Sequence, residues 1–297
     1  MMEANIGSEF CKWATAFFMD APSNLSTSGP GLHQVDRPPA EEFSLFRTFT
    51  RHLRESIRHY GFFNTASQLL TELHRLVADQ LPHRKREKYD DLEFDWEHSV
   101  DTTRANLSFR LQFINALIGH EYWPTEPGMF AQMMKELPLG FKDRDDFKDF
   151  TFIDLGSGKG RILMMAAGYS FRRIVGVEFV PELHEIALKN IAIYGKDHEG
   201  CERIEPLCVD ARDFQFPLEP LVIFLFNPFP EPVFASVLEN LRLSLERETR
   251  PVYIAYRYLE MEHLLEDCDW LMTVAGTEEW AIYKNTSGKK KEKQQEP

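Results

Sequence analysis

The spacing of apolar residues changes along this 297-residue chain and distinguishes an N-terminal part from a C-terminal part. Between residues 41 and 138, apolar residues recur every three or four positions, as at Phe49, Leu53 and Ile57, which is the spacing of one helix face. From Thr151 onward, short apolar runs alternate with stretches of helical spacing. The pattern predicts a helical N-terminal part followed by an α/β domain with a mostly parallel sheet.

The α/β part contains five apolar runs that predict parallel strands. These runs are Thr151–Leu155, Arg173–Glu178, Pro206–Ala211, Leu221–Phe226 and Val252–Tyr256. Helical spacing fills the intervals between them, most clearly over Arg161–Ala167 and Pro181–Tyr194. Two further runs, Leu271–Val274 and Trp280–Tyr283, lie on either side of Gly276 and predict a final antiparallel hairpin. We therefore expect a seven-stranded sheet whose ligand site lies at the carboxyl ends of its strands.

Composition suggests four segments. Residues 1–40 mix Pro, Ser and Gly and predict a flexible arm, and residues 41–138 predict a helical cover. Residues 139–284 form the predicted α/β core, and the lysine-rich residues 285–297 predict a disordered tail. Within the cover, the basic cluster at Arg84–Lys88 precedes an acidic stretch, Asp90–Glu97. We interpret both as a solvated loop of mixed charge, with a lip that steers a charged substrate as the alternative.

Three alternate glycines follow the first predicted strand. Gly156, Gly158 and Gly160 lie between Thr151–Leu155 and the predicted helix Arg161–Ala167. Glycines allow the backbone to turn sharply and a ligand to approach without a Cβ in the way. The helix N-terminus that follows leaves unpaired N–H groups directed at such a ligand. This arrangement is typical of a nucleotide-type cofactor site.

The residues around the glycines separate the possible cofactors. A phosphate-binding P-loop requires G-x-x-x-x-G-K-[ST], and here Lys159 is followed by Gly160. A dinucleotide turn requires G-x-G-x-x-G, and Arg161 occupies the place of its last glycine. Asp154 would also repel a pyrophosphate, whereas a carboxylate there would attract an ammonium or sulfonium group.

The stretch Asp154–Gly160 resembles motif I of the class I, Rossmann-like methyltransferases that use S-adenosylmethionine. The resemblance implies S-adenosylmethionine as cofactor, with S-adenosylhomocysteine as product. Glu178 ends the next strand, about 20 residues beyond the turn, where an acid binds ribose hydroxyls. Asp210 ends the third strand and, by the resemblance, accepts from the adenine amino group. The cofactor contacts that the resemblance implies around these strand ends are Asp154, Gly156, Ser157, Gly158, Gly160, Glu178, Phe179, Asp210 and Ala211.

A second resemblance involves the loop upstream of the glycine turn. Tyr122 and Thr125, followed by a predicted helix and motif I, are similar to the Rossmann-type (non-SET) histone-lysine methyltransferases. In class I enzymes the corresponding segment folds over the methionine end of the cofactor, and together the two resemblances imply that Tyr122 and Thr125 are cofactor contacts. The alternative is a helix-capping turn with an aromatic residue in the core.

The stretch Asn227-Pro228-Phe229 follows the fourth predicted strand and resembles the [DNS]-P-P-[YFW] motif of methyltransferases that modify nitrogen. The resemblance implies that Asn227, which also lies at the cofactor, and the Pro228 carbonyl accept hydrogen bonds from the target nitrogen. An aromatic residue then packs on the substrate. Phe229 stands where the motif has its second proline, which weakens the match to adenine- or glutamine-specific enzymes. The alternative is a rigid turn with a structural role.

Charge and cysteine content narrow the context of the predicted enzyme. The net charge of −13 argues against general attraction to nucleic acid phosphates. The four cysteines show no metal-binding spacing, so we expect reduced thiols, no metal site and a cytoplasmic protein. No apolar run reaches the roughly 18 residues of a membrane helix. The sequence does not indicate an oligomeric state.

The sequence predicts a methyltransferase that acts on nitrogen, with a protein lysine or a similar amine as the first choice of acceptor. A small molecule is the next candidate and nucleic acid the third. The alternative of another class is a non-catalytic scaffold that binds S-adenosylmethionine, and an NAD-dependent oxidoreductase is a further alternative.

Overall fold

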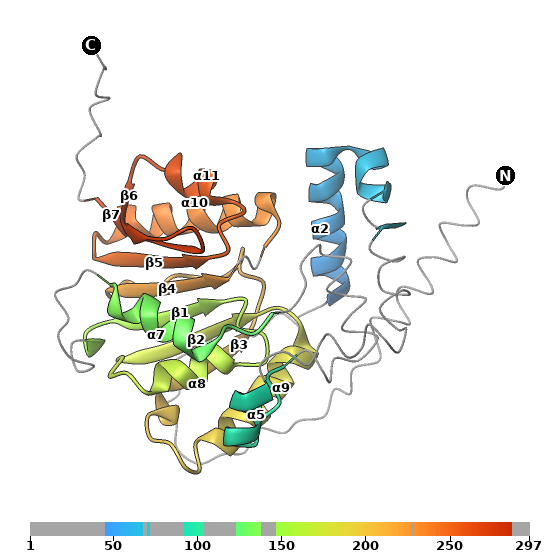
Figure 1. The fold of residues 1–297 in the computed structure, drawn as a ribbon. Coiled ribbons are helices and arrows are strands. Elements are labelled where there is room, and N and C mark those ends of the chain that lie inside the picture. Colours follow the sequence, from blue (N-terminus) through green and yellow to red (C-terminus); the bar gives the residue numbers. More distant parts are fainter. Residues whose placement is uncertain are drawn as a thin grey trace.

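Seven strands form one sheet in the order β3-β2-β1-β4-β5-β7-β6 (Figure 1). This computed structural model describes residues 45–67, 70–71, 92–103, 123–137, 147–226 and 229–286. The strands are β1 (Thr151–Leu155), β2 (Arg173–Glu178), β3 (Ile204–Cys208), β4 (Leu221–Phe226), β5 (Val252–Arg257), β6 (Leu271–Gly276) and β7 (Trp280–Asn285). The predicted Rossmann-like sheet is thereby confirmed.

The first five strands are parallel, and the chain reverses its direction of winding between β1 and β4. The two central strands β1 and β4 are buried almost throughout, because helices cover both faces of a parallel sheet. The predicted end of β3 is wrong. We expected it to run through Asp210 to Ala211, but it ends at Cys208 because its neighbour β2 ends opposite, at Glu178.

The C-terminal hairpin is confirmed, and its second strand lies inside the sheet. β7 pairs antiparallel with β5 on one side and with β6 on the other. A register shift between Thr273 and Ala275 bends β6 against β7. β6 therefore forms the edge of the sheet, and β7, the last strand in sequence, lies within it.

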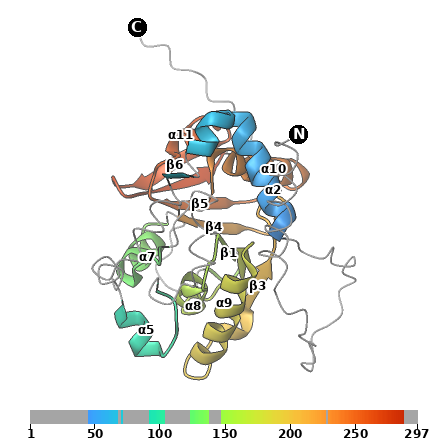
Figure 2. The same cartoon turned by 90° about the vertical axis from the view of Figure 1, so that its right-hand side faces the viewer.

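Helices cover the two faces of the sheet (Figures 1 and 2). On one face lie α7 (Pro127–Lys135), α8 (Arg161–Ala167) and α9 (Pro181–Tyr194). On the other face lie α10 (Glu231–Arg247) and α11 (Glu262–Glu266), whose apolar residues pack against alternate residues of β1 and β4. A short 3₁₀ helix, Cys201–Arg203, leads into β3. The helices that connect the parallel strands cross the sheet from one end to the other. The loops that follow these strands therefore all lie at the same edge of the sheet.

Two N-terminal helices contact this core. α2 (Leu45–Tyr60) lies beside α10, and α5 (Leu92–His98) packs against α8 through Phe94 and Met164. Our interpretation of the acidic stretch as a solvated loop is wrong for Asp95, which lies in α5 and is buried. The predicted arm, the basic cluster and most of the predicted tail lie outside the described residues, and the proposed division into four segments stays a prediction.

Candidate functional site

The glycine turn after β1 has the backbone conformation that its sequence requires. Gly156, Gly158 and Gly160 all have positive φ angles, of 86°, 52° and 85°. Side chains with a Cβ rarely adopt this left-handed region, so the glycines are needed for the turn itself. The N–H groups of Gly156 and Ser157 both donate to the carbonyl of Val177 in β2, at 2.8 and 3.1 Å. The turn is therefore held against the end of the neighbouring strand.

A fourth glycine, Gly176 in β2, makes room for this turn. A Cβ at Gly176 would lie 2.5 Å from Leu163 Cδ1 and 2.9 Å from Ser157 Oγ, both too close for a side chain. Gly158 N–H donates to Glu178 Oε2 at 2.9 Å, so the turn is also tied to the acid at the end of β2. The predicted contact residues Gly156 to Gly160 and Glu178 are thus brought together.

Asp154 lies beside the turn, and its carboxylate is buried. Its exposed fraction is 3%, and no hydrogen-bond donor reaches it among the described residues. Because Asp154 pairs with Gly176, and alternate strand residues share a face, Asp154 and Glu178 lie on the same side of the sheet. Burial, together with the charge of Glu178, raises the pKa of Asp154 well above its usual value. An uncompensated buried carboxylate of this kind favours a cation as its partner.

Glu178 is the second buried acid of the site. Its Oε1 accepts the N–H of Val180 at 2.8 Å, while its Oε2 accepts that of Gly158. Burial raises the pKa of Glu178 to about 7, and the backbone donors offset part of this effect because they favour the ionised form. Each carboxylate oxygen can accept more than one hydrogen bond, so ribose hydroxyls could share these oxygens with the backbone.

The raised pKa of Glu178 makes its predicted contact with the ribose of the cofactor testable by pH. Below pH 7 the free protein carries a proton on this acid, and hydroxyl donors favour the ionised form, so binding must release the proton. We expect the affinity for S-adenosylhomocysteine to fall as the pH falls below 7, by up to about tenfold per pH unit. Titration calorimetry at pH 5.5 to 8.5, in buffers of different ionisation enthalpy, measures both the affinity and the proton release.

Glu178→Gln is the control for this pH dependence, since it cannot ionise. An affinity that changes equally with pH in the wild type and in this variant would contradict the assignment of the proton to Glu178.

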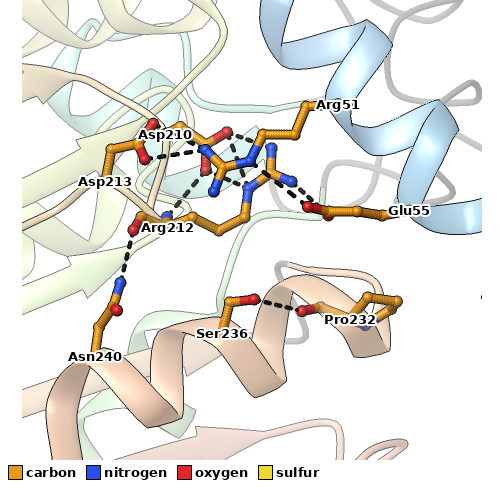
Figure 3. A network of polar contacts seen from close by, with 8 residues as sticks. All are labelled: Arg51, Glu55, Asp210, Arg212, Asp213, Pro232, Ser236 and Asn240. Carbon is orange, nitrogen blue, oxygen red and sulfur yellow. Dashed lines mark hydrogen bonds and ion pairs between the residues drawn. The ribbon is translucent and has the colours of Figure 1, made fainter. Parts of the chain in front are cut away.

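Asp210 lies two residues after β3, and its carboxylate is bound by Arg212. The Arg212 Nε donates to Asp210 Oδ1 at 2.9 Å, and the same guanidinium also binds Glu55 of α2 (Figure 3). Arg51 of α2 binds Asp213 at 2.9 Å in the same network. An adenine amino group at Asp210 would have to share the carboxylate with Arg212, so this predicted contact stays a prediction. Ala211 is buried beside Asp210, and Phe179, which follows Glu178, is half-buried.

The predicted acceptor motif is only partly described. Asn227 and Pro228 lie outside the described residues. Phe229 is 6% exposed and belongs to the core that α10 covers, which leaves little of its ring for an acceptor. Tyr258, directly after β5, has a ring that is 55% exposed and lies 6.3 Å from that of Phe226 at the end of β4. Its φ of 62° is unusual for a bulky residue and is the kind of local strain that concentrates at functional sites.

The loop before α7 is described from Trp123, so Tyr122 falls outside the described residues. Thr125 is buried, at 2% exposure, two residues before Pro127 begins α7. The N-cap of α7 is Glu126, whose side chain makes no capping hydrogen bond, and Pro127 occupies the first helical turn, where its lack of an N–H costs no hydrogen bond. α7 packs against α8, which follows the glycine turn. The roles of Tyr122 and Thr125 stay predictions.

Sequence reasoning missed a set of buried polar residues at the far end of the turn. Lys159 and Arg161 are 0% and 2% exposed, and both contact the segment Asp95–Thr103. A signal was available, because cations on either side of Gly160 in a tight turn need acids from elsewhere in the chain if they are buried. Among the described residues there is no group of His, Cys, Asp and Glu that could hold a metal, and no helix that could span a membrane.

Comparison with known proteins finds partial similarities in shape. No protein-family model matches the chain, and no curated protein does. An RNA methyltransferase from Salinibacter ruber, solved with S-adenosylhomocysteine, is 23% identical over 55% of this chain and 92% of that one, with a TM-score of 0.37. An S-adenosylmethionine-dependent O-methyltransferase from Thermotoga maritima is 16% identical over 58% and 69%, with a TM-score of 0.41.

A third solved structure, a predicted N6-adenine-specific DNA methylase from Listeria monocytogenes, is 16% identical over 57% of this chain and 53% of that one, with a TM-score of 0.41. At these scores and identities, neither the activity of this chain nor its acceptor follows from the likeness. The residues of the site therefore carry the functional proposal.

Proposed function

We propose that this chain is an S-adenosylmethionine-dependent methyltransferase. The observation that supports this most strongly is Asp154, a buried carboxylate with no donor among the described residues, beside a turn of three glycines in the left-handed conformation. A cation at Asp154 would compensate its charge, and the amino and sulfonium groups of the cofactor are cations. Glu178 offers a second acceptor on the same side of the sheet for ribose hydroxyls. The site residues therefore fit this cofactor.

Bound S-adenosylmethionine supplies a methyl group on a positively charged sulfur that is already a good leaving group. The task of the chain is then mainly to position the acceptor, and positioning alone can provide effective molarities of about 10⁵–10⁸ M. In this proposal the acids of the site serve as binding groups for the cofactor.

Our preferred acceptor is a nitrogen, such as a protein lysine or a similar amine. Asn227 and the carbonyl of Pro228 would accept hydrogen bonds from it, as the resemblance implies, and direct its lone pair. Because Phe229 is buried in the core, Tyr258 is the better candidate for the aromatic residue that packs on the acceptor. A lysine amine has a pKa of about 10.4 in water and must lose its proton before it can attack, which desolvation beside these aromatic rings would favour.

The first test is ligand-dependent thermal stability. At about 100 times its Kd, a ligand of the folded state adds roughly 2.7 kcal/mol of stability. We expect stabilisation by S-adenosylmethionine and S-adenosylhomocysteine and none by NAD; stabilisation by NAD alone would overturn the proposal. Transfer of a labelled methyl group into a cell lysate, fractionated into protein, nucleic acid and small molecules, then identifies the acceptor. Binding without any transfer would favour the scaffold alternative.

Asn227→Ala separates an enzyme from a scaffold at the level of one residue. We expect this variant to keep its affinity for S-adenosylhomocysteine and to lose about 100-fold or more in turnover, because the acceptor nitrogen loses a positioning hydrogen bond. Calorimetry and a methyl-transfer assay measure the two quantities separately. The control is Asn227→Ser, which retains an acceptor oxygen and should keep part of the turnover. Equal losses of affinity and turnover in Asn227→Ala would indicate a structural role.

A further inference from the structure

The segment Asp95–Thr103 lies against the glycine turn, although more than 50 residues separate it from the turn in sequence. It consists of the end of α5 and the residues that follow it. Its contacts fall on Lys159 and Arg161, the two residues that flank Gly160. The contact therefore lies where the turn becomes α8.

Asp95 is the centre of the first contact. Its Oδ2 accepts the N–H groups of Thr102 and Thr103, at 2.7 and 2.9 Å, which closes the segment into a loop. Its Oδ1 accepts from the Thr102 hydroxyl and, at 3.2 Å, from the guanidinium of Arg161. The Nε of Arg161 also donates to Thr102 Oγ1 at 2.6 Å, and its guanidinium lies 4.8 Å from the ring of Phe94. Both charges are buried, so each needs the other.

Lys159 makes the second contact from the other side of Gly160. Its Nζ donates to Asp101 Oδ1 and to the carbonyl of Thr103, both at 2.8 Å, and its side chain is fully buried. Asn190 of α9 completes this contact, because its amide nitrogen donates to the carbonyls of both Asp101 and Lys159 at 2.7 and 2.9 Å. The Asp101 N–H returns a hydrogen bond to Asn190 Oδ1 at 2.9 Å.

We propose that Asp95 and Asp101 are positioning residues for the cofactor, because they hold the turn Gly156–Gly160 in its binding conformation through Arg161 and Lys159. The turn contains three glycines with positive φ angles, and glycine is the most flexible residue. Backbone hydrogen bonds of the turn alone would therefore leave it flexible. The buried ion pair of Arg161 with Asp95, the ion pair of the buried Lys159 with the partly exposed Asp101, and the Asn190 bridge fix both sides of Gly160 instead. The segment is thus part of the cofactor site, whereas the predicted division of the chain placed it in a separate cover. As a role in cofactor binding, this rests on the proposed function.

The test compares Asp95→Asn and Asp101→Ala with Glu93→Gln. Glu93 is an exposed acid on the same helix and serves as the control. We expect both aspartate variants to bind S-adenosylhomocysteine about tenfold or more weakly in calorimetry, and Glu93→Gln to bind it as the wild type does. Hydrogen–deuterium exchange of the free proteins should become faster in peptides that cover residues 156–163, and should stay unchanged in β4 and β5.

Two results would overturn the proposal. The first is that the aspartate variants match the Glu93→Gln control both in the exchange rate of residues 156–163 and in the affinity for S-adenosylhomocysteine. The other is faster exchange throughout the sheet, which would mean a general structural role. Should Asp95→Asn fail to fold, Asp101→Ala decides, because its side chain is 36% exposed and its loss disturbs the core less. If the wild type does not bind S-adenosylhomocysteine, the proposed function fails, while the exchange experiment still tests whether the segment holds the turn.

Discussion

Asp154→Asn is expected to weaken the binding of S-adenosylmethionine by about 10- to 100-fold, which is the contribution of a hydrogen bond or contact to a charged partner. The same substitution should make the free protein more stable above neutral pH. Burial raises the pKa of Asp154, so the folded protein holds a proton that the unfolded chain releases once the pH exceeds about 4. Stability is therefore lost as the pH rises from about 4 towards the raised pKa of the folded state. Asn cannot ionise and avoids this loss.

Thermal unfolding of the free protein at pH 5 and pH 8 measures this effect. We expect Asp154→Asn to unfold at a higher temperature than the wild type at pH 8, and to show a smaller gain at pH 5. Asp149→Asn is the matched control, because Asp149 is exposed and lies just before β1. A variant that keeps full affinity for the cofactor would show that Asp154 does not face it. A larger loss of affinity for S-adenosylmethionine than for S-adenosylhomocysteine would place the carboxylate nearer the sulfur than the amino group, because only S-adenosylmethionine has a charged sulfur.

Gly160→Ala is expected to abolish measurable cofactor binding and to lower the free energy of unfolding by about 1–3 kcal/mol. Two effects combine at this position. Gly160 has a φ of 85°, which costs a residue with a Cβ about 1–2 kcal/mol. Its new Cβ would also lie 3.1 Å from Ala187 Cβ in α9, so either the turn or the helix must shift.

Two other glycines separate these effects. Gly61 has a φ of 82° with nothing within 4 Å of its would-be Cβ, so Gly61→Ala should show only the backbone cost and leave cofactor binding intact. Gly128 lies in the first turn of α7 with open space around it, and Gly128→Ala should be neutral or slightly stabilising. Denaturant unfolding and calorimetry on the three variants provide the comparison. Cofactor affinity in Gly160→Ala equal to that in Gly61→Ala would contradict a role of the turn geometry in binding.

The sequence predicts the strands and the glycine turn well because their signals are local. β1, β2 and β4 are apolar runs that end at a glycine, an acid or a proline-rich turn, and their observed bounds match those expected. α8 and α9 also match, since a glycine turn or a proline marks the start of each. The end of β3 has no such local signal in the sequence, because it depends on where its neighbour β2 ends.

The contacts of Asp95 were not predictable from its surroundings in the sequence. The acids of the stretch Asp90–Glu97 around it suggest a solvated loop, yet its partner Arg161 lies 66 residues away. Likewise, the strand-end position of Asp210 suggests a free acceptor, while the fold places Glu55 of α2 against Arg212, whose guanidinium also holds Asp210. Pairings of this kind depend on which segments the topology places side by side, and a pattern within one segment does not contain that information.

The insertion of β7 between β5 and β6 makes this end of the sheet depend on one strand. β6 is synthesised before β7, and β7 is the strand with which it pairs in the described sheet. β5 likewise has one open side until β7 arrives. A chain in which β7 has come away from the sheet therefore exposes the open side of β5 and leaves β6 without this partner, and such strand edges are sites for pairing with other chains. Substitutions that loosen β7 should favour aggregation more than equally destabilising substitutions in a helix that covers the sheet.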